Sequence, residues 1–361
     1  MKTITLKCKL ITPMFMAGAD GRTPELRPSE FKGMMRFWWR AIRADDNIEE
    51  LRKDEARILG GSGEEQGKSK VIIKVYPQPS NQFCGTNLKE DFGLQWSFNR
   101  NINSLEGRDA GIGYLLYSTV LPNQERAYIK PNFQFNIELS SYDEESFKNA
   151  LASLWTAIYL GGFGTRARRG GGNLEIVEAK GNLYELSFRL SASSKTELNN
   201  RLKENLDKIF KICDCKSSVA LYPNLKNSKI IILDHEDSWQ KALDKIGNIF
   251  KEFRENNKSD IFNMGAFGMP IMHNRFRVRI VPYENTNNRF SERMASPLII
   301  KLIKVEKKYF PVIVRLSTSL PLAGKERKEG NNWQKEQVQN INFTKIDEFL
   351  NNIRNKEEIC L

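Results

Sequence analysis

The chain has 361 residues, a length that favours two domains. Its 40% hydrophobic content excludes a disordered chain, and the absence of a long apolar run excludes a membrane-spanning one. Lysines interrupt the first ten residues, unlike a signal peptide, and five cysteines are an odd number for a disulfide framework. We therefore expect a cytoplasmic protein. The net charge of +12 favours a polyanionic partner.

The first half of the chain alternates strand and helix patterns. In chain order, we predict a strand over 4–10, a helix over 29–44 capped by Ser29, an exposed acidic stretch over 45–55, strands near 70–76 and 132–139, a helix over 143–160 and a strand over 173–178. Strand, helix, strand, strand, helix, strand is the order of a ferredoxin-like domain. Residues 77–130 are then an insertion between its middle strands.

The second half predicts a more distorted α+β domain. The expected strands cover 186–190, 229–233, 275–281, 297–305 and 309–316, and the expected helices cover 195–211, 238–254 and 344–354. Residues 324–339 are charged and rich in Gly and Asn, which is typical of a mobile loop. The domain boundaries that follow are 1–180 and 181–361.

The helix over 29–44 carries cations on one stripe. At 100° per residue, Phe31, Met35 and Trp38 share an apolar face. The separate cationic stripe consists of Lys32, Arg36, Arg40 and Arg43, with Trp39 at its edge. Such a stripe on a packed helix suits contact with nucleic-acid phosphates, and Trp39 could stack on a base. The alternative is an ordinary solvated face.

Residues 161–172, GGFGTRARRGGG, form a glycine-rich loop between a helix and a strand. Glycines such as Gly161, Gly162, Gly164 and Gly170 let backbone amides approach an anion. Three arginines, Arg166, Arg168 and Arg169, supply forked donors for phosphate. The run lacks the ending of a Walker loop, and its helix-to-strand position is the reverse of a dinucleotide fingerprint. The alternative is a flexible linker.

A third basic cluster covers residues 274–280. Strand alternation places Arg275, Arg277 and Arg279 on one face and apolar side chains on the other. This face could hold a nucleic-acid backbone, with Arg275 and Arg277 as the candidate contacts. An edge strand protected by charge explains the pattern equally well.

The residues suggest no metal site or cofactor. The chain has two histidines, His235 and His273, and neither lies in a metal-binding motif. Cys213 and Cys215 have no second pair at zinc spacing. A metal-independent endoribonuclease is the alternative function, because RNA carries its own 2′-hydroxyl nucleophile. His273, beside the arginine-rich strand, is then the first candidate for its acid or base.

Several segments together resemble one protein family. They are ITPMFMAGAD (11–20), PELRP (24–28), KGMMRFWWRA (32–41), EARILG (55–60), GIGYLLY (111–117), the glycine-rich loop, FGMPI (267–271) and RMASPL (293–298). In this order they resemble the RAMP proteins of type III-B CRISPR systems, in particular the first subunit of the Cmr effector complex. The glycine-rich loop is shared by RAMP proteins generally, whereas the Phe-Trp-Trp-Arg run is specific to this subunit.

The resemblance implies a fold and a role. The fold would be α+β with two ferredoxin-like (RRM-like) domains, the first with a long insertion. The role would be non-catalytic: binding near the 3′ end of the guide CRISPR RNA, engaging single-stranded target RNA, and contacting other Cmr subunits, especially the repeated backbone subunit. Lys32, Arg36, Arg40 and the loop arginines would face RNA. A stand-alone RNA-binding protein is a third hypothesis.

Overall fold

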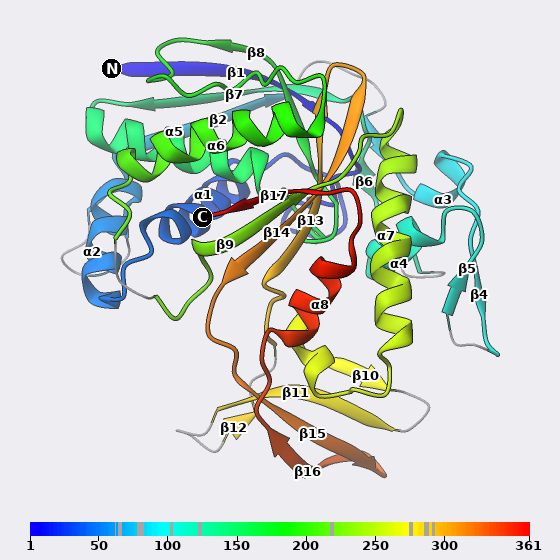
Figure 1. Cartoon of the computed structure of the whole chain (residues 1–361). Helices are drawn as coiled ribbons and strands as arrows, with labels where there is room; N and C mark the ends of the chain where they lie inside the picture. The colour runs from blue at the N-terminus through cyan, green and yellow to red at the C-terminus, as the bar shows by residue number, and fades with distance from the viewer. Residues whose placement is uncertain are drawn as a thin grey trace.

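The computed structural model describes residues 1–61, 63, 67–77, 83–101, 104–121, 125–216, 220–273, 277–284, 289–290 and 293–361. The chain is a mixed α+β protein in which antiparallel sheets alternate with layers of helices (Figure 1). None of the helices in these residues combines the length and apolar character that crossing a lipid bilayer requires.

The first sheet contains the four strands predicted for the first half. They are β1 (Lys2–Leu10), β2 (Val71–Pro77), β7 (Gln134–Ser141) and β8 (Leu174–Lys180). Their order is β2-β7-β1-β8, and every neighbouring pair is antiparallel. Alternation along β1 buries Leu6 and Cys8 against α1 (Pro28–Arg43) and α5 (Glu144–Tyr159). The predicted sequence of strands and helices is therefore present.

Two details near α1 differ from the sequence predictions. The helix begins at Pro28, with Arg27 as its N-cap residue, so Ser29 lies inside the first turn and the predicted cap is wrong. Proline suits this position because its fixed φ is helical and its missing N–H needs no partner. The acidic stretch after α1 is exposed over most of its length, as predicted, but it also contains a helix that was not predicted, α2 (Ile48–Leu59). The Asn47 side chain caps it, and Leu51 is buried.

The second sheet lies between two helical layers. Its strands are β9 (Asn224–Ile232), β13 (Leu298–Val305), β14 (Lys308–Ser317) and β17 (Glu357–Cys360), in the antiparallel order β13-β14-β9-β17. One face packs against α1, α5 and α6 (Lys195–Ile212), and the other against α7 (Trp239–Asn256) and α8 (Thr344–Asn352) (Figure 1). Ile230 and Ile231 accordingly join different cores. Burial on both faces explains the continuous apolar runs of these strands.

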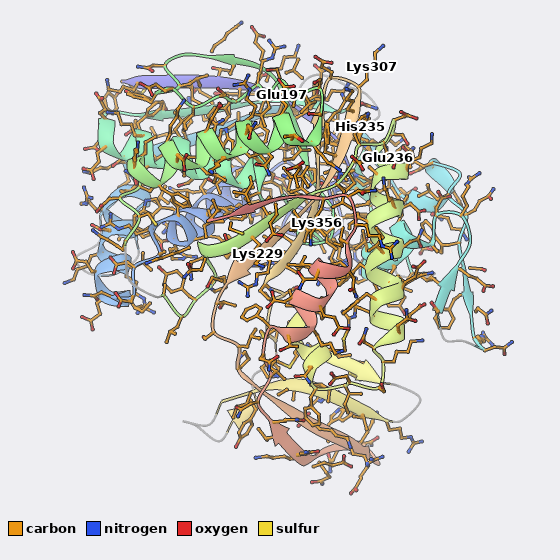
Figure 2. The ribbon with its side chains drawn as sticks, viewed as in Figure 1. Glu197, Lys229, His235, Glu236, Lys307 and Lys356 are labelled. Carbon is orange, nitrogen blue, oxygen red and sulfur yellow. The ribbon has the colours of Figure 1, made fainter. Side chains whose placement is uncertain are left out.

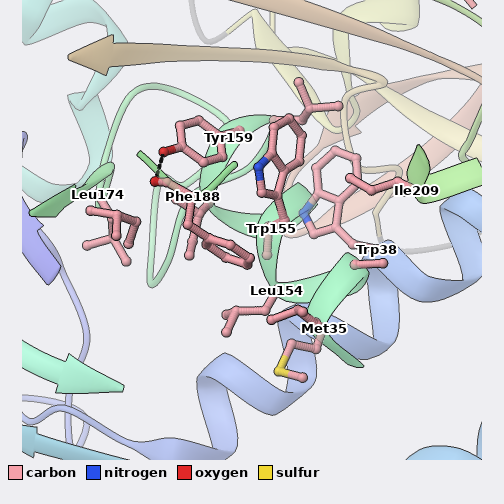
Figure 3. Close-up of a cluster of buried hydrophobic side chains, with 14 of the residues drawn as sticks. Met35, Trp38, Leu154, Trp155, Tyr159, Leu174, Phe188 and Ile209 are labelled. Atoms are coloured by element: carbon pink, nitrogen blue, oxygen red, sulfur yellow. Dashed lines mark hydrogen bonds between the residues drawn. The ribbon is translucent and has the colours of Figure 1, made fainter. Parts of the chain in front are cut away.

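The layer between the sheets is the main core of the molecule. Trp38 of α1 and Trp155 of α5 are completely buried there, beside Ile209 of α6 (Figure 3). Phe188 comes from the segment that was predicted to be a strand over 186–190, and this prediction is wrong. Its peptide groups bond to side chains instead: Trp155 Nε1 donates to the Ser187 carbonyl at 2.9 Å, and the Ser187 N–H donates to Asn205 Oδ1 at 2.8 Å.

The insertion between β2 and β7 docks on the second half of the chain. It holds β3 (Cys84–Gly85), α3 (Leu88–Asp91), β4 (Ser97–Asn99), β5 (Ser104–Glu106), α4 (Ala110–Leu115), the 3-10 turn η1 (Tyr117–Thr119) and β6 (Tyr128–Ile129). Helix α4 crosses α7 where two glycines, Gly111 and Gly247, leave no room for a Cβ atom. The Gly111 N–H donates to Asp244 Oδ1 at 2.8 Å. The insertion therefore links the two halves.

A third sheet is built from two further segments and lies at one end of the molecule (Figure 1). The 3-10 turn η2 (Asn263–Phe267) leads into the first segment, which holds β10 (Ile271–His273), β11 (Val278–Glu284) and β12 (Arg289–Phe290). The second segment holds β15 (Leu322–Glu329) and β16 (Asn332–Gln339). The strand order is β10-β11-β15-β16, and β12 pairs with β11. The prediction of a mobile loop over 324–339 is therefore wrong. The segment is a hairpin that turns at Gly330, where Glu336 pairs with Lys325 at 2.7 Å and also with Arg327.

Candidate nucleic-acid interface

Three of the four predicted helix cations are held in ion pairs. Arg36 and Arg40 of α1 each place a nitrogen 2.6 Å from a carboxylate oxygen of Glu55 on α2. Arg43 lies 2.9 Å from both Asp54 and Asp214. Sequence reasoning missed these pairs because Asp54 and Glu55 lie on the next helix, α2, which was not predicted. Asp214 lies after α6, far from Arg43 in the sequence. The three arginines attach α2 to α1, so much of their charge is compensated within the fold.

Lys32 is the cation of this stripe for which the described residues show no carboxylate partner. It is half-buried, and burial together with the charge of Arg36 lowers its pKa. It lines a groove of about 870 Å³ between α1, α2 and β2, which Arg52 and Lys68 also line. The groove therefore presents cations to solvent beside the ion-paired Arg36.

Trp39 does not face solvent. Its side chain is 1% exposed, and its indole Nε1 donates to Asn149 Oδ1 at 2.9 Å. The prediction that Trp39 stacks on a base is therefore wrong. Because Trp39 lies at the edge of the apolar arc of α1, it was predicted to be on the surface. Helix α5 packs over that edge, so the buried arc extends to Trp39.

The glycine-rich loop is packed rather than flexible. The Thr165 N–H donates to the Phe15 carbonyl and the Gly172 N–H to the Pro13 carbonyl, both at 2.8 Å. A Cβ at Gly161 would lie 2.5 Å from Trp38 Nε1, and Gly164 adopts a φ of +80°. Gly161, Gly162 and Gly170 are buried, so these glycines make room for close packing. Their predicted contact with an anion stays a prediction.

Arg168 and Arg169 attach the loop to the second half of the chain. Arg168 donates to the Ser296 carbonyl, and its guanidinium carbon lies 5.1 Å from the centre of the Phe37 ring. Arg169 donates to the Leu298 carbonyl at 2.8 Å and to the Phe267 carbonyl at 3.1 Å. These bonds satisfy carbonyl oxygens, but within the described part of the chain the guanidinium charges have no opposing carboxylate.

Arg166 has a buried Nε that lacks a hydrogen-bond partner among the residues that the structure describes. Its backbone has a φ of +66°. Burial and the charge of Arg293 lower the pKa of Arg166, and burial with neighbouring arginines, Arg254 first, lowers that of Arg169. We call Arg166, Arg168, Arg169, Arg254 and Arg293 the arginine cluster.

The arginine cluster can bind an anion. Among the residues that the structure describes, no carboxylate lies within 4.0 Å of the guanidinium nitrogens of Arg166, Arg168 or Arg169 to form an ion pair. A phosphate bound at the exposed parts of these guanidinium groups would relieve the repulsion between the cations. Arg254 lies in the last turn of α7, and its guanidinium carbon is 5.7 Å from the centre of the Phe250 ring, which Arg169 also approaches. Sequence reasoning missed Arg254 because no local pattern connects it to the loop.

The other predicted residues lie elsewhere. Arg275 lies outside the described residues. Arg277 is exposed and precedes β11 in the third sheet, apart from the loop that leads into β8 (Figure 1). Arg279, the third arginine of this basic cluster, forms an ion pair with Glu326. His273 lies on β10, and His235 lies with its ring centre 5.3 Å from that of Phe310 (Figure 2). Within the described ranges, no group of three or more potential metal ligands comes together.

Comparison with known proteins decides the family. Residues 7–175 match the RAMP superfamily. The Cmr subunit Cmr1-1 of the Pyrococcus furiosus CRISPR system is 28% identical over 308 residues, which cover 82% of this chain and 81% of that protein. The Cmr1-2 subunit of the same organism is 36% identical over 180 residues, which cover 46% of this chain and 90% of that protein. The chain belongs to the Cmr1 family of RAMP proteins.

Two solved structures share the fold of this chain. The crystal structure of apo Cmr1 from Pyrococcus furiosus has a TM-score of 0.67 to this chain, with 22% identity and coverage of 99% of this chain and 98% of that one. A chain of a type III-B Cmr-beta complex, solved by cryo-electron microscopy with cognate target RNA and AMPPnP, gives 0.59 at 16% identity, covering 89% and 95%. The chain therefore shares the mixed α+β fold of Cmr1.

Proposed function

We propose that this Cmr1-family chain is a non-catalytic RNA-binding subunit of a type III-B Cmr effector complex. It binds near the 3′ end of the guide CRISPR RNA and helps to engage single-stranded target RNA. The observation that carries the proposal is the arginine cluster, whose charges have no carboxylate partner among the described residues. The family membership and the fold shared with a chain of a complex bound to target RNA support it.

The chemistry of the arginine cluster suits the RNA backbone. Guanidinium groups bind phosphate oxygens through paired N–H donors, and such contacts carry no information about base sequence. In RNA-guided complexes, specificity is delegated to pairing between guide and target. The chain would thus hold RNA strands in register while the guide reads the target. Lys32 and the groove beside it would add a further phosphate contact.

We infer that the architecture consists of two ferredoxin-like domains, over 1–180 and 181–361. Both main sheets support this, because each takes the order second, third, first, fourth strand with helices after the first and third strands. The third sheet is then an insertion that distorts the second domain. We place the protein in the cytoplasm with the other Cmr subunits, and we expect the repeated backbone subunit to be its principal neighbour.

A non-catalytic role follows from the residue types that gather at the site. Arginine keeps its proton at neutral pH and cannot act as a general base. The Arg166, Arg168 and Arg169 side chains can bind and orient a phosphate, but they offer no group to take a proton from a 2′-hydroxyl. We therefore assign target cleavage to another subunit.

A gel-shift experiment tests the proposal. The protein is titrated against labelled single-stranded RNA and the matched DNA in EDTA, and the RNA is examined for cuts on the same gel. We expect RNA to bind in a salt-sensitive manner and to remain intact. Site-specific cleavage in EDTA that His273→Ala abolishes would overturn the non-catalytic role. Failure to associate with the other Cmr subunits would favour a stand-alone protein instead.

A further inference from the structure

The third sheet carries a tryptophan whose ring is only partly covered. Trp333 lies on the edge strand β16, keeps part of its surface exposed, and belongs to none of the three hydrophobic clusters that the described residues form. The exposed part of its indole is therefore open to a ligand, while the rest is covered within the sheet.

The register of the strands places Trp333 on a cationic face. In the strand register, Arg279 of β11 lies opposite Glu326 of β15. Glu326 in turn lies opposite Lys335 of β16, and Lys328 lies opposite Trp333. Because cross-strand partners share a face, we call Arg279, Glu326, Lys328, Trp333 and Lys335 the tryptophan face. Residues such as Val278, Ile280 and Ala323 lie on the opposite face and pack into the small core of the sheet.

Contacts of Arg279 and Lys335 hold two aromatic rings of the third sheet in place. The Arg279 guanidinium carbon lies 4.4 Å from the centre of the Trp333 ring, and Arg279 also bonds to the buried Glu326. Lys335 lies 4.1 Å from the centre of the Tyr283 ring and donates to its hydroxyl at 3.0 Å. A guanidinium stacked on an indole is a planar, positively charged surface on which a nucleobase can stack.

Charge favours the same ligand. The segments 271–293 and 322–339, which contribute the strands of this sheet, contain nine Lys or Arg residues and five Asp or Glu residues. Lys328 is exposed beside Trp333, and exposed Gln334 and Gln337 offer amide donors and acceptors on the same strand. Proteins that bind single strands without sequence preference combine aromatic stacking surfaces with a basic track in this way.

We propose that the tryptophan face binds single-stranded RNA, with a base stacked on Trp333 and a phosphate near Lys328. This inference rests on the proposed RNA-binding function, and it adds a second contact site on a different part of the molecule from the arginine cluster. A strand that reaches both sites would be held by phosphates at the cluster and by stacking at the third sheet.

The tryptophans of the chain make the proposal directly measurable. All six lie in the described residues, and five of them are buried: Trp38, Trp39, Trp96, Trp155 and Trp239. Acrylamide quenching of the fluorescence should therefore report mainly on Trp333. We expect a twelve-residue oligouridylate to protect this fluorescence from acrylamide, and Trp333→Ala to remove the protected component and weaken binding about tenfold. Trp333→Phe should restore most of the affinity because it keeps a ring.

Two charge variants separate this site from a general electrostatic effect. Lys328→Ala should lower the slope of log K against log salt by about 0.7, the value for one phosphate on a single strand. Arg327→Ala removes the same charge from the opposite face and should leave the slope unchanged. Equal effects of the two variants, or no protection of Trp333 by saturating oligouridylate, would overturn the proposal. Protection of Trp333 by other Cmr subunits alone would also overturn it and mark a protein interface.

The outcome is distinguishable from failure of the proposed function. If RNA binds and Arg166→Ala weakens it while Trp333 stays unprotected, the arginine cluster stands and the tryptophan face does not. If Trp333 is protected and Arg166→Ala has no effect on affinity, the reverse holds. Absence of any RNA binding to the full chain would contradict both.

Discussion

At the scale of single residues, neighbouring arginines of one loop divide between two tasks. Arg169 is a structural link, because its donors satisfy the carbonyls of Leu298 and Phe267. Arg166 makes no such bond and has a buried Nε without a partner. Their spacing in the sequence does not distinguish Arg166 from Arg169, but the surroundings of the two guanidinium groups differ.

This division predicts different effects on stability. Arg169→Ala leaves two carbonyl oxygens without their donor, so we expect the free energy of unfolding to fall by about 1–3 kcal/mol. Arg166→Ala should leave it nearly unchanged, since no hydrogen bond is lost. Urea unfolding followed by circular dichroism measures both, with Arg166→Ala as the matched control. Equal destabilisation by the two variants would contradict the assignment.

The sequence alone identifies the loop arginines as candidates, but it cannot tell which of them is a structural link and which is available to bind phosphate. Residue type and local spacing identify Arg166, Arg168 and Arg169, because forked donors next to accessible backbone amides are features of anion sites. Burial by a distant strand is not encoded locally, and β13 begins about 130 positions further along the chain. The same holds for Trp39, whose partner Asn149 lies on α5. Such contacts depend on how the layers stack.

At the scale of secondary-structure elements, α2 converts an apparent surface stripe into an anchor. Glu55 is 8% exposed and bonds to both Arg36 and Arg40, while Arg36 also donates to the Leu59 carbonyl at 2.7 Å. The acidic composition of the segment indicated a solvated stretch. Its helical period places Glu55 toward α1, and that direction is visible only once the segment is read as a helix.

Removing the charge of Glu55 should therefore loosen α2. We expect Glu55→Gln to lower the free energy of unfolding by about 3 kcal/mol, because two arginines lose a shared, largely buried partner. Glu49→Gln, which alters an exposed glutamate in the first turn of the same helix, should have a much smaller effect. Thermal unfolding of both variants checks this. A loss for Glu49→Gln as large as that for Glu55→Gln would count against the anchor.

The N-terminus of α5 should make stability depend on pH. Asp143 caps this helix by accepting from the Ser146 N–H at 2.7 Å, and this bond holds the pKa of Asp143 below its ordinary value of 3.8. A lowered folded-state pKa means that the stabilisation is present above pH 3.8 and is lost as the pH falls through the folded pKa. Asn can cap the helix but does not titrate in this range.

We therefore expect the difference in melting temperature between the wild type and Asp143→Asn to shrink as the pH falls from 6 to 2. Differential scanning calorimetry at intervals over that range measures it. A difference that stays constant would show that Asp143 stays ionised or contributes nothing as a charged cap.

At the scale of the whole molecule, the two main sheets share one core. Helices α1, α5 and α6 lie between them, and the fully buried Lys301 of β13 bonds to the Ile158 carbonyl near the end of α5. Periodicity predicted the four strands of the first sheet, β9, β13 and β14 of the second, and the long helices, because alternation and amphipathic spacing are local. It missed α2, β17 and the hairpin of β15 and β16, and it placed a strand over 186–190 where none forms. It did not predict that the second sheet is covered on both faces, or that the third sheet forms from segments some forty residues apart.

The central claim is that uncompensated arginines of the glycine-rich loop, rather than the ion-paired arginines of α1, contact RNA phosphates. The most direct test is the salt dependence of single-stranded RNA binding for the wild type and Arg166→Ala. Arg201→Ala, which removes an exposed cation paired with Glu204 on α6, is the matched control. The account predicts that Arg166→Ala lowers the slope of log K against log salt by about 0.7 and that the control leaves it unchanged. An unchanged slope for Arg166→Ala would contradict it.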